Sequence, residues 1–498
     1  MSTRLEMPTD NASTDVDTPS RLCNDQRRTS CIRGEPFSAD RTITRKYRMT
    51  NALLNRRGFM QIGALALGGL TLPEILAARE ASGSHDSDTS VIMLYQHGGA
   101  SQLETYDLKP NAPTSYRSVF NPIPTNVPGL NICELFPLQA KMADRFSIVR
   151  SLHHVVGIHS DGGIVALTGK RPTVLDPTSQ SKSEHPDFGS VTCAVNGFSE
   201  KVMPPYVAIP RAPYMTRPTY LGLHRSAFET GDPNSKSYQP PQVKLAAGRD
   251  GNFLAQRQSL LQKFDRLRSN LDTRGQLEGT DRFRDMAFEL MTSPHVAKAF
   301  AIDQETDALR DRYGRNEWGQ SCLLARRLAE SGTSVVNIYF NTPKAGPEFT
   351  NWDDHIGNAG RPGHFAKYMR VRLPYMDQAL SALIDDIFTR DLDRKILVVV
   401  VGEFGRTPRL STNATGAGRN HWPQAYSALL SGGGLRMGQV VGATNSKAEY
   451  PAEQPHTPQD LLATIYRHLG IDPSSTLTDH SGRPVYILDS GRPIADLI

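Results

Sequence analysis

Short apolar runs recur along the chain and predict the strands of a buried sheet. The strongest run is Ile396–Val401, which is aliphatic and mostly β-branched throughout. A run of this kind is typical of a parallel strand that is covered on both faces. Shorter runs of the same character predict the other strands, at residues 91–95, 147–150, 206–209, 334–339 and 426–430.

Helical patterns separate several of these runs. In residues 364–390, apolar side chains recur mostly three and four positions apart, and the segment leads directly into the strand at 396–401. Residues 456–469 predict a further helix, with Thr457 as its N-cap and Pro458 at its first position. Strands that alternate with helices predict an α/β fold, in which a doubly wound and mostly parallel sheet carries helices on both faces.

The pattern changes between about residues 222 and 332, where long charged helices replace the alternation. We expect these helices to form an inserted layer that covers the sheet. A proline-rich loop over residues 212–242 links them to the core, and we expect it to lie at the rim of the site. The expected helices span residues 253–271, 280–291 and 304–329, the last with a break near Tyr313 and Gly314.

The beginning of the chain predicts a leader outside the fold. Residues 1–50 are rich in Ser, Thr, Asp and Arg and have too little apolar surface for a core, so we expect them to be disordered. Residues 51–81 have the charged, apolar and small-residue parts of an export signal, and the paired Arg56 and Arg57 favour the twin-arginine type. We therefore expect a periplasmic or extracellular protein whose α/β domain spans residues 88–498.

Composition and charge exclude several kinds of partner. The formal net charge of the 498 residues is only +5, which is no footprint of nucleic-acid binding. The apolar run at residues 62–72 is shorter than the roughly 20 residues that a spanning helix needs, so we expect no membrane span in the mature protein. Beyond the leader, Cys133, Cys193 and Cys322 are widely separated, and we expect them to fill the core rather than form disulfides or bind a metal.

Acidic and imidazole side chains follow several of the predicted strands. Because the carboxyl ends of parallel strands meet at one edge of a sheet, we expect these side chains to converge there. They are His97, Glu104, Asp107, His153, His154, His159, Asp161, Asp353, Asp354, His355, Glu403 and His421. Mixed carboxylates and imidazoles suit zinc, manganese or iron better than calcium. The sequence thus predicts a site for one or two divalent metal ions, zinc or manganese being favoured, with the ligands His97, Asp107, Asp353, His355, Glu403 and His421.

The segments 399–408 and 418–423 contain several charged and imidazole side chains at and after the end of the most strongly predicted strand. Glu403 can ligate a metal, and His421 can ligate a metal or act as a general acid. Arg406 and Arg409 carry guanidinium groups that suit a phosphate, sulfate or carboxylate. We therefore expect a cation and an anion to be held at this place.

At this point the chain resembles the sulfatase-like family called domain of unknown function 1501, within the alkaline phosphatase and sulfatase superfamily. The resemblance covers nearly all of residues 51–498. The matching pieces are Arg56 to Phe59, His97-Gly-Gly99 with Asp107 and Lys109-Pro110, His159 through Gly169, Trp352 to His355, Gly402 to Pro408, Gly418 to Pro423 and His456-Thr-Pro458. The resemblance implies an alkaline-phosphatase-like sheet whose strand ends hold one or two metals and a Ser, Thr or formylglycine-forming Cys nucleophile.

The sequence departs from the superfamily at the nucleophile. His159 falls near its position, and neither the modifiable cysteine nor its arginine is present, so formylglycine chemistry is not expected. The two aspartates that usually end the first strand are matched by Gln96 and His97. Ser160 and water remain as alternative nucleophiles.

Three functions stay open from the sequence. The leading hypothesis is a metal-dependent hydrolase of phosphate or sulfate esters, small or polysaccharide, in which a metal activates water or Ser160. Arg406 or Arg409 would then neutralise the ester, while His421 or His159 moves protons. The alternative is a catalytically degenerate envelope protein that binds carbohydrate or partner proteins through the same cleft. A third hypothesis is a structural envelope protein whose polar clusters serve folding alone. The oligomeric state is not predicted.

Overall fold

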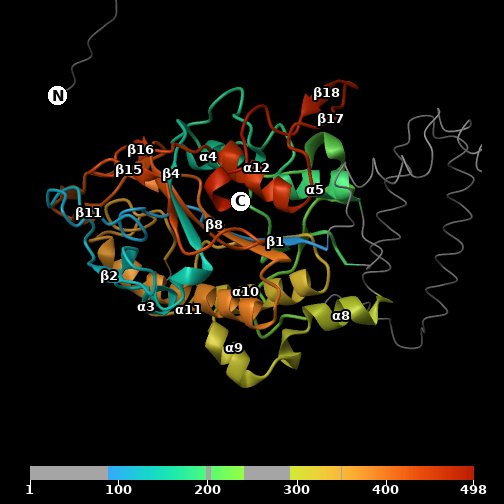
Figure 1. Cartoon of the computed structure of the whole chain (residues 1–498), viewed down its shortest axis with the longest axis horizontal. Helices are drawn as coiled ribbons and strands as arrows, with labels where there is room; N and C mark the ends of the chain where they lie inside the picture. The colour runs from blue at the N-terminus through green and yellow to red at the C-terminus, as the bar shows by residue number, and fades with distance from the viewer. Residues whose placement is uncertain (1–87, 198–202, 240–291, 349) are drawn as a thin grey trace, which may run out of the picture. The chain divides into compact units, whose positions relative to one another are not determined.

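A sheet of eight strands forms the centre of the described α/β domain (Figure 1). The computed structural model describes residues 88–197, 203–239, 292–348 and 350–498. In spatial order the strands are β14 (Val440–Val441), β4 (Ser147–Leu152), β13 (Tyr426–Gly432), β8 (Ile396–Val401), β1 (Ser90–Tyr95), β7 (Val335–Tyr339), β5 (Tyr206–Ile209) and β6 (Phe228–Glu229). All neighbours pair in parallel except those of β13, which runs against both β4 and β8.

The central strands are buried because helices cover both faces of the sheet. Every residue of β1 and β8 is buried, and Val91 pairs in register with Val335 on one side and Leu397 on the other. Side chains of a strand alternate between faces. Accordingly, Ile92 packs into one apolar core and Val91 into the other. The mostly parallel α/β fold that the sequence predicted is confirmed.

Helices from different parts of the chain form the two covering layers (Figure 1). One layer contains α3 (Pro137–Ala140), α8 (Pro294–Phe300), α9 (Asp307–Tyr313), α10 (Glu317–Glu330) and α11 (Ala366–Thr389). The other contains α4 (His159–Thr168), α5 (Phe188–Asn196) and α12 (Pro458–His468). α11 matches the helix expected at residues 364–390, and its C-terminus leads into β8 as expected.

Several predicted helix ends and the predicted state of the cysteines are also present in the structure. The expected break near Tyr313 lies between α9 and α10, where Gly314 has φ +99°, a backbone conformation that favours glycine. α12 begins as predicted, with Thr457 as the N-cap of a capping box that includes Asp460. The three cysteines beyond the leader are buried and free. The leader and the helices expected at 253–271 and 280–291 lie outside the described residues.

Short two-stranded pieces extend beyond the main sheet and carry part of the site. They pair β2 (Pro122–Pro124) with β3 (Asn131–Cys133), β9 (Gly405–Arg406) with β12 (His421–Trp422), β10 (Ser411–Asn413) with β11 (Gly416–Gly418), β15 (Ala443–Thr444) with β16 (Pro451–Glu453), and β17 (Thr476–Thr478) with β18 (Pro484–Tyr486). In the β9–β12 pair, His421 lies directly opposite Arg406. Among the described residues, no helix is long and apolar enough to cross a membrane.

Candidate metal centre

Side chains from distant parts of the sequence meet at the carboxyl edge of the sheet. β1, β4, β7 and β8 run in the same direction, so the segments that leave them begin at the same edge. The converging residues are His97 after β1, His159 at the start of α4, Asp353 and His355 after β7, Glu403 after β8, and His421 in β12. The predicted convergence of these acidic and imidazole groups is therefore present in the structure.

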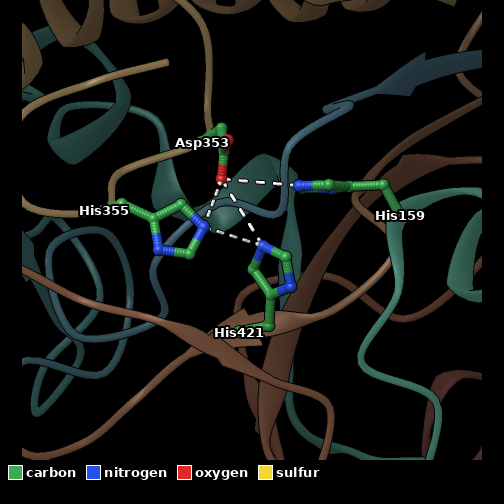
Figure 2. A group of neighbouring side chains, drawn as sticks. All are labelled: His159, Asp353, His355 and His421. Atoms are coloured by element: carbon green, nitrogen blue, oxygen red, sulfur yellow. Dashed lines mark hydrogen bonds and ion pairs between the residues drawn. The ribbon is translucent and has the colours of Figure 1, made fainter. Parts of the chain in front are cut away.

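Four of these residues form a compact group around the Asp353 carboxylate (Figure 2). Asp353 Oδ1 lies 3.1 Å from His355 Nε2, 3.4 Å from His159 Nε2 and 3.5 Å from His421 Nε2. The Nε2 atoms of His355 and His421 are 3.0 Å apart. Three imidazoles thus direct the same ring nitrogen toward one carboxylate oxygen.

The other ring nitrogen of each histidine faces an acceptor oxygen. The Nδ1 contacts are 2.7 Å from His159 to Glu403 Oε1, 3.0 Å from His355 to Asn420 Oδ1 and 2.8 Å from His421 to the Gly157 carbonyl. An acceptor at Nδ1 fixes the proton on that atom and leaves Nε2 to bind a proton or a cation. Histidines that ligate metals are oriented in this way by carboxylates, carbonyls or amides behind them.

The spacing of the donor atoms fits one tetrahedral ion. Zinc binds nitrogen and oxygen at about 2.0–2.2 Å, and four ligands at that radius lie roughly 3.3 Å from one another. The three distances from Asp353 and the distance between His355 and His421 run from 3.0 to 3.5 Å, and all four donor atoms lie within 4.8 Å of one another. Three imidazoles and one carboxylate are also a donor set typical of transition-metal sites. The four residues therefore have the geometry and the chemistry to hold a divalent metal.

Arg406 holds Asp353 in place and keeps it ionised. Burial opposes the charge of Asp353, but the hydrogen bonds from the three histidines and the nearby charge of Arg406 together hold its pKa well below its usual value. Arg406 is fully buried and places Nη2 2.7 Å from Asp353 Oδ1. It also donates from Nε to the Gly99 carbonyl at 3.0 Å and from Nη1 to the Arg419 carbonyl at 3.2 Å. The sequence suggested Arg406 for binding a substrate anion, but its guanidinium group donates to oxygens of the protein instead.

Glu403 lies behind His159 rather than within the group of four. It is fully buried, and its Oε1 accepts a hydrogen bond from the Gly98 amide at 2.7 Å as well as the contact from His159. His97 Nδ1 is 3.5 Å from the same oxygen, so His97, His159 and Glu403 form a second cluster with metal-ligand chemistry. In this cluster Glu403 orients the imidazole that faces Asp353.

The charges of His159 and Glu403 depend on each other in the metal-free protein. Burial opposes ionisation of Glu403, but the charge of His97 and the contact with His159 lower its pKa to about 2. Burial likewise opposes the charged form of His159, yet hydrogen bonds to Asp353 and Glu403 raise its pKa to about 9. By contrast, burial lowers the pKa of both His97 and His421. Of these three histidines, His159 is therefore the one whose charged form is favoured near neutral pH.

Several residues that the sequence singled out lie apart from the two clusters. Asp107 is buried 3.1 Å from Lys109 and accepts a hydrogen bond from Thr444. Glu104 and Arg419 form a buried ion pair at 2.9 Å. Neither carboxylate belongs to a cluster with metal-ligand spacing in the described part of the chain. Asp107 thus holds Lys109 and Thr444 together and is not one of the clustered donors.

Ser160 and Arg409 also lie away from the group of four. Ser160 is fully buried, and its hydroxyl faces the Asp161 carboxylate at 3.5 Å. Arg409 is exposed and lines a cavity of about 540 Å³ together with Tyr116 and Trp422. Trp422 follows His421 in β12, and successive side chains of a strand point to opposite faces. Arg409 therefore belongs to a surface on the other side of this strand.

Two contacts behind the histidines were not predicted. Asn420, which contacts His355, directly precedes His421 within the motif Gly418 to Pro423, so the sequence did contain a signal for it. The Gly157 carbonyl left no signal in the sequence, because a main-chain oxygen is present at every residue.

The family model described as "Protein of unknown function (DUF1501)" matches residues 88–498. The chain belongs to this family. None of the curated proteins matches its sequence. Among solved structures, the chain is similar to the lipoteichoic acid synthase LtaP from Listeria monocytogenes, with 9% identity, TM-score 0.34 and coverage of 83% of this chain and 80% of that one.

Two further similarities are to a sulfatase and to a phosphonate monoester hydrolase. The PsFucS1 sulfatase from Pseudoalteromonas sp. is 11% identical, with TM-score 0.35 and coverage of 79% of this chain and 72% of that one. The phosphonate monoester hydrolase of Agrobacterium radiobacter is 11% identical, with TM-score 0.35 and coverage of 82% and 77%. Because the identities and TM-scores are so low, the assignment of function depends on the geometry of the site.

Proposed function

We propose that this protein is an exported zinc-dependent hydrolase of phosphate or sulfate esters. One observation carries the proposal: three imidazole Nε2 atoms and one ionised carboxylate converge at distances that suit a tetrahedral ion. Three nitrogen donors favour zinc over manganese, which prefers oxygen-rich sites. The group is also open to solvent, since the His355 side chain is 40% exposed.

The residues around the centre have separable roles in this proposal. When bound, the metal would polarise an ester oxygen and lower the pKa of water. Arg406 fixes the Asp353 carboxylate, and Glu403 fixes the ring of His159. Burial lowers the pKa of His97 and so favours the neutral imidazole, which can accept a proton from the nucleophile. Since the Ser160 hydroxyl is buried against Asp161, water is favoured as that nucleophile.

The buried position of Ser160 also favours a second candidate. A member of this fold that lacks an accessible side-chain nucleophile could bind carbohydrate or a partner protein without hydrolysing it. Both candidates include the metal, so metal content does not separate them. Turnover does: the hydrolase must release phosphate or sulfate from simple aryl esters, whereas the binding protein must not.

The Asp353→Asn variant tests the metal centre. We expect purified wild-type protein to contain close to one zinc per chain by elemental analysis, and the variant to lose most of it, because an amide cannot supply the negative charge. Hydrolysis of p-nitrophenyl phosphate or sulfate should fall by at least about a hundredfold, as expected when charge stabilisation at the reacting centre is lost.

A matched control is Asp391→Asn. Asp391 lies in the turn between α11 and β8, near the amino end of β8, and its φ of +55° is tolerated by asparagine. We expect its zinc content and its activity to equal those of the wild type. Wild-type protein that holds no zinc after purification with added zinc, or an Asp353→Asn variant that retains both zinc and activity, contradicts the proposal.

Export forms part of the same proposal and rests on residues 51–81. Twin-arginine signals depend on the arginine pair and carry proteins that are already folded, which suits a protein that acquires its metal before export. Changing Arg56 and Arg57 together to lysine should leave the protein inside the cell. Unchanged export of that variant contradicts the assigned route without affecting the metal centre.

A further inference from the structure

Two exposed cations, Arg211 and Lys182, lie on the faces of aromatic rings that contact His97. Arg211 follows β5 by two residues, and β5 is parallel to β1 and β7, so Arg211 reaches the same edge of the sheet as the metal centre. Lys182 comes from the segment between α4 and α5. Both side chains are largely exposed.

Tyrosine rings connect these cations to the centre. The Arg211 guanidinium lies 5.3 Å above the centroid of the Tyr339 ring, and that ring is 5.4 Å from the ring of His97. The Lys182 ammonium lies 4.9 Å above the Tyr214 ring, and Tyr214 meets His97 edge-on at 5.5 Å. His97 is therefore flanked by two rings, each of which holds a cation on its face.

The link continues from His97 to the group of four. The rings of His97 and His159 are 5.4 Å apart, and His159 belongs to both clusters of metal-ligand character. Burial lowers the pKa of His97, and the positive charge of Arg211 acts in the same direction, which agrees with their closeness. A series of ring contacts thus connects Arg211, through Tyr339 and His97, to His159 of the group of four.

Neither cation is neutralised by a carboxylate of the described residues. Within the ranges that the structure describes, Arg211 contacts the Tyr339 ring and Lys182 contacts the Tyr214 ring and donates to the Tyr214 carbonyl, and neither forms an ion pair with a carboxylate. The buried arginines near the site differ in this respect, because Arg406 is paired with Asp353 and Arg419 with Glu104. Two unpaired cations on ring faces beside a metal centre leave a positive surface that is suited to an anion.

We propose that Arg211, assisted by Lys182, binds the oxyanion of the substrate next to the metal centre. The chemical class is a tetrahedral phosphate or sulfate group carried by an ester, and the identification of that group as substrate rests on the proposed hydrolase function. Arg211 thereby takes the role that the sequence suggested for Arg406 or Arg409. Guanidinium binds two oxygens of such a group side by side, whereas lysine contributes a point charge.

Binding of inorganic phosphate and inorganic sulfate to the zinc-loaded protein tests the inference, with isothermal titration calorimetry as the measurement. We expect Arg211→Gln to weaken the binding of at least one of these anions by about tenfold to a hundredfold, in line with loss of a charged hydrogen-bond pair. Lys182→Gln should weaken it less. Zinc content should stay unchanged in both variants, because neither side chain belongs to the group of four. The two anions together show whether the site selects phosphate or sulfate.

Two further variants act as controls. Arg211→Lys keeps the charge but not the paired donors, so its affinity should lie between those of the wild type and Arg211→Gln. Arg467→Gln removes an exposed arginine from the last turn of α12, away from the contacts described above, and should bind both anions as the wild type does.

The outcomes separate this inference from the proposed function. If the wild type binds zinc and Arg211→Gln binds both anions as tightly as the wild type, the anion site is wrong and the metal centre stands. The inference is also overturned if the wild type binds neither anion. If the protein holds no zinc but loses anion binding in Arg211→Gln, the hydrolase proposal fails while the anion site is supported.

Discussion

At the scale of single residues, the centre is organised by what lies behind each histidine. Glu403 is fully buried and its carboxylate contacts Nδ1 of His159, while the Gly157 carbonyl contacts Nδ1 of His421. These contacts fix which ring nitrogen faces Asp353, and ligands with a fixed orientation need no rearrangement when an ion binds. A lone histidine in a loop would have no partner that fixes the orientation of its ring. The partners of the three histidines are therefore stronger signs of a metal site than the histidines themselves.

The His159–Glu403 pair predicts how the metal-free protein responds to pH. The pKa of His159 rises from 6.5 to about 9 on folding, so its contribution to stability is complete below pH 6.5 and is lost as pH rises to about 9. The pKa of Glu403 falls from 4.5 to about 2, so its contribution is complete above pH 4.5 and is lost as pH falls to about 2. Both contributions are present between about pH 4.5 and 6.5.

Thermal unfolding at pH 6 and pH 9, with the metal removed by a chelator, measures this pH dependence of stability. We expect the wild type to lose stability on the order of 3 kcal/mol between these values through His159, at about 1.4 kcal/mol for each unit of pKa shift. His159→Gln should remove that part of the pH dependence, because glutamine does not titrate. Identical pH profiles for the wild type and the variant would show that the pair does not form an ion pair in the folded protein.

At the scale of elements, short strand pairs beyond the main sheet position the ligands. The pairing of β9 with β12 sets His421 opposite Arg406, and Arg406 in turn contacts Asp353. β11 brings Gly418 against the main chain of the loop that carries His355. A Cβ atom at Gly418 would lie 1.9 Å from the His355 carbonyl oxygen, which no side chain tolerates. Close approach of these two segments thus requires glycine here.

Gly418→Ala should therefore move His355 and weaken the metal centre. We expect its zinc affinity to fall by about tenfold or more, as is typical when the support of a ligand is lost, with lower thermal stability in addition. Gly434→Ala is a suitable control, because Gly434 has φ +68° but no atom within 4 Å of the added Cβ. The control should lose about 1 kcal/mol of stability through its backbone conformation and keep its zinc. Full zinc affinity in Gly418→Ala would contradict this role.

At the scale of the whole molecule, the centre ties together segments that are far apart in sequence. Its four donors come from the start of α4, the loop after β7 and the strand β12, which are far apart in the sequence. An ion bound by all of them stabilises only the folded arrangement, because the unfolded chain does not bring these residues together. Binding to the folded state alone raises stability by about 4 kcal/mol when the free ligand exceeds its dissociation constant a thousandfold.

Removal of the metal should therefore lower the thermal stability of the protein. We expect a strong chelator to reduce Tm by on the order of 5 °C, and stoichiometric zinc to restore it. Asp353→Asn, which lacks one ligand, should show little response to either treatment. A wild-type Tm that is the same with chelator and with zinc would argue against an ion shared by the four donors.

The sequence determined the elements and the edge of the sheet at which the chemistry lies. The aliphatic run at Ile396–Val401 and the periodicity before it were sufficient to predict β8 and α11, because local burial patterns fix strands and helices. The parallel arrangement then placed the residues that follow β1, β4, β7 and β8 at one edge. His97, His159, Asp353, His355, Glu403 and His421 could all be selected on this basis.

Only the tertiary structure decided which of these side chains share a centre and which support it. Asp107 follows β1 as His97 does, yet it faces Lys109 and Thr444 instead of the two clusters. Arg406 and Arg211 are both arginines at the same edge, but one is buried against Asp353 and the other is exposed on Tyr339. The physical reason is that strand ends fix positions only to within a loop's reach, whereas ligation requires atoms placed to within a few tenths of an ångström, and packing between distant segments supplies that placement.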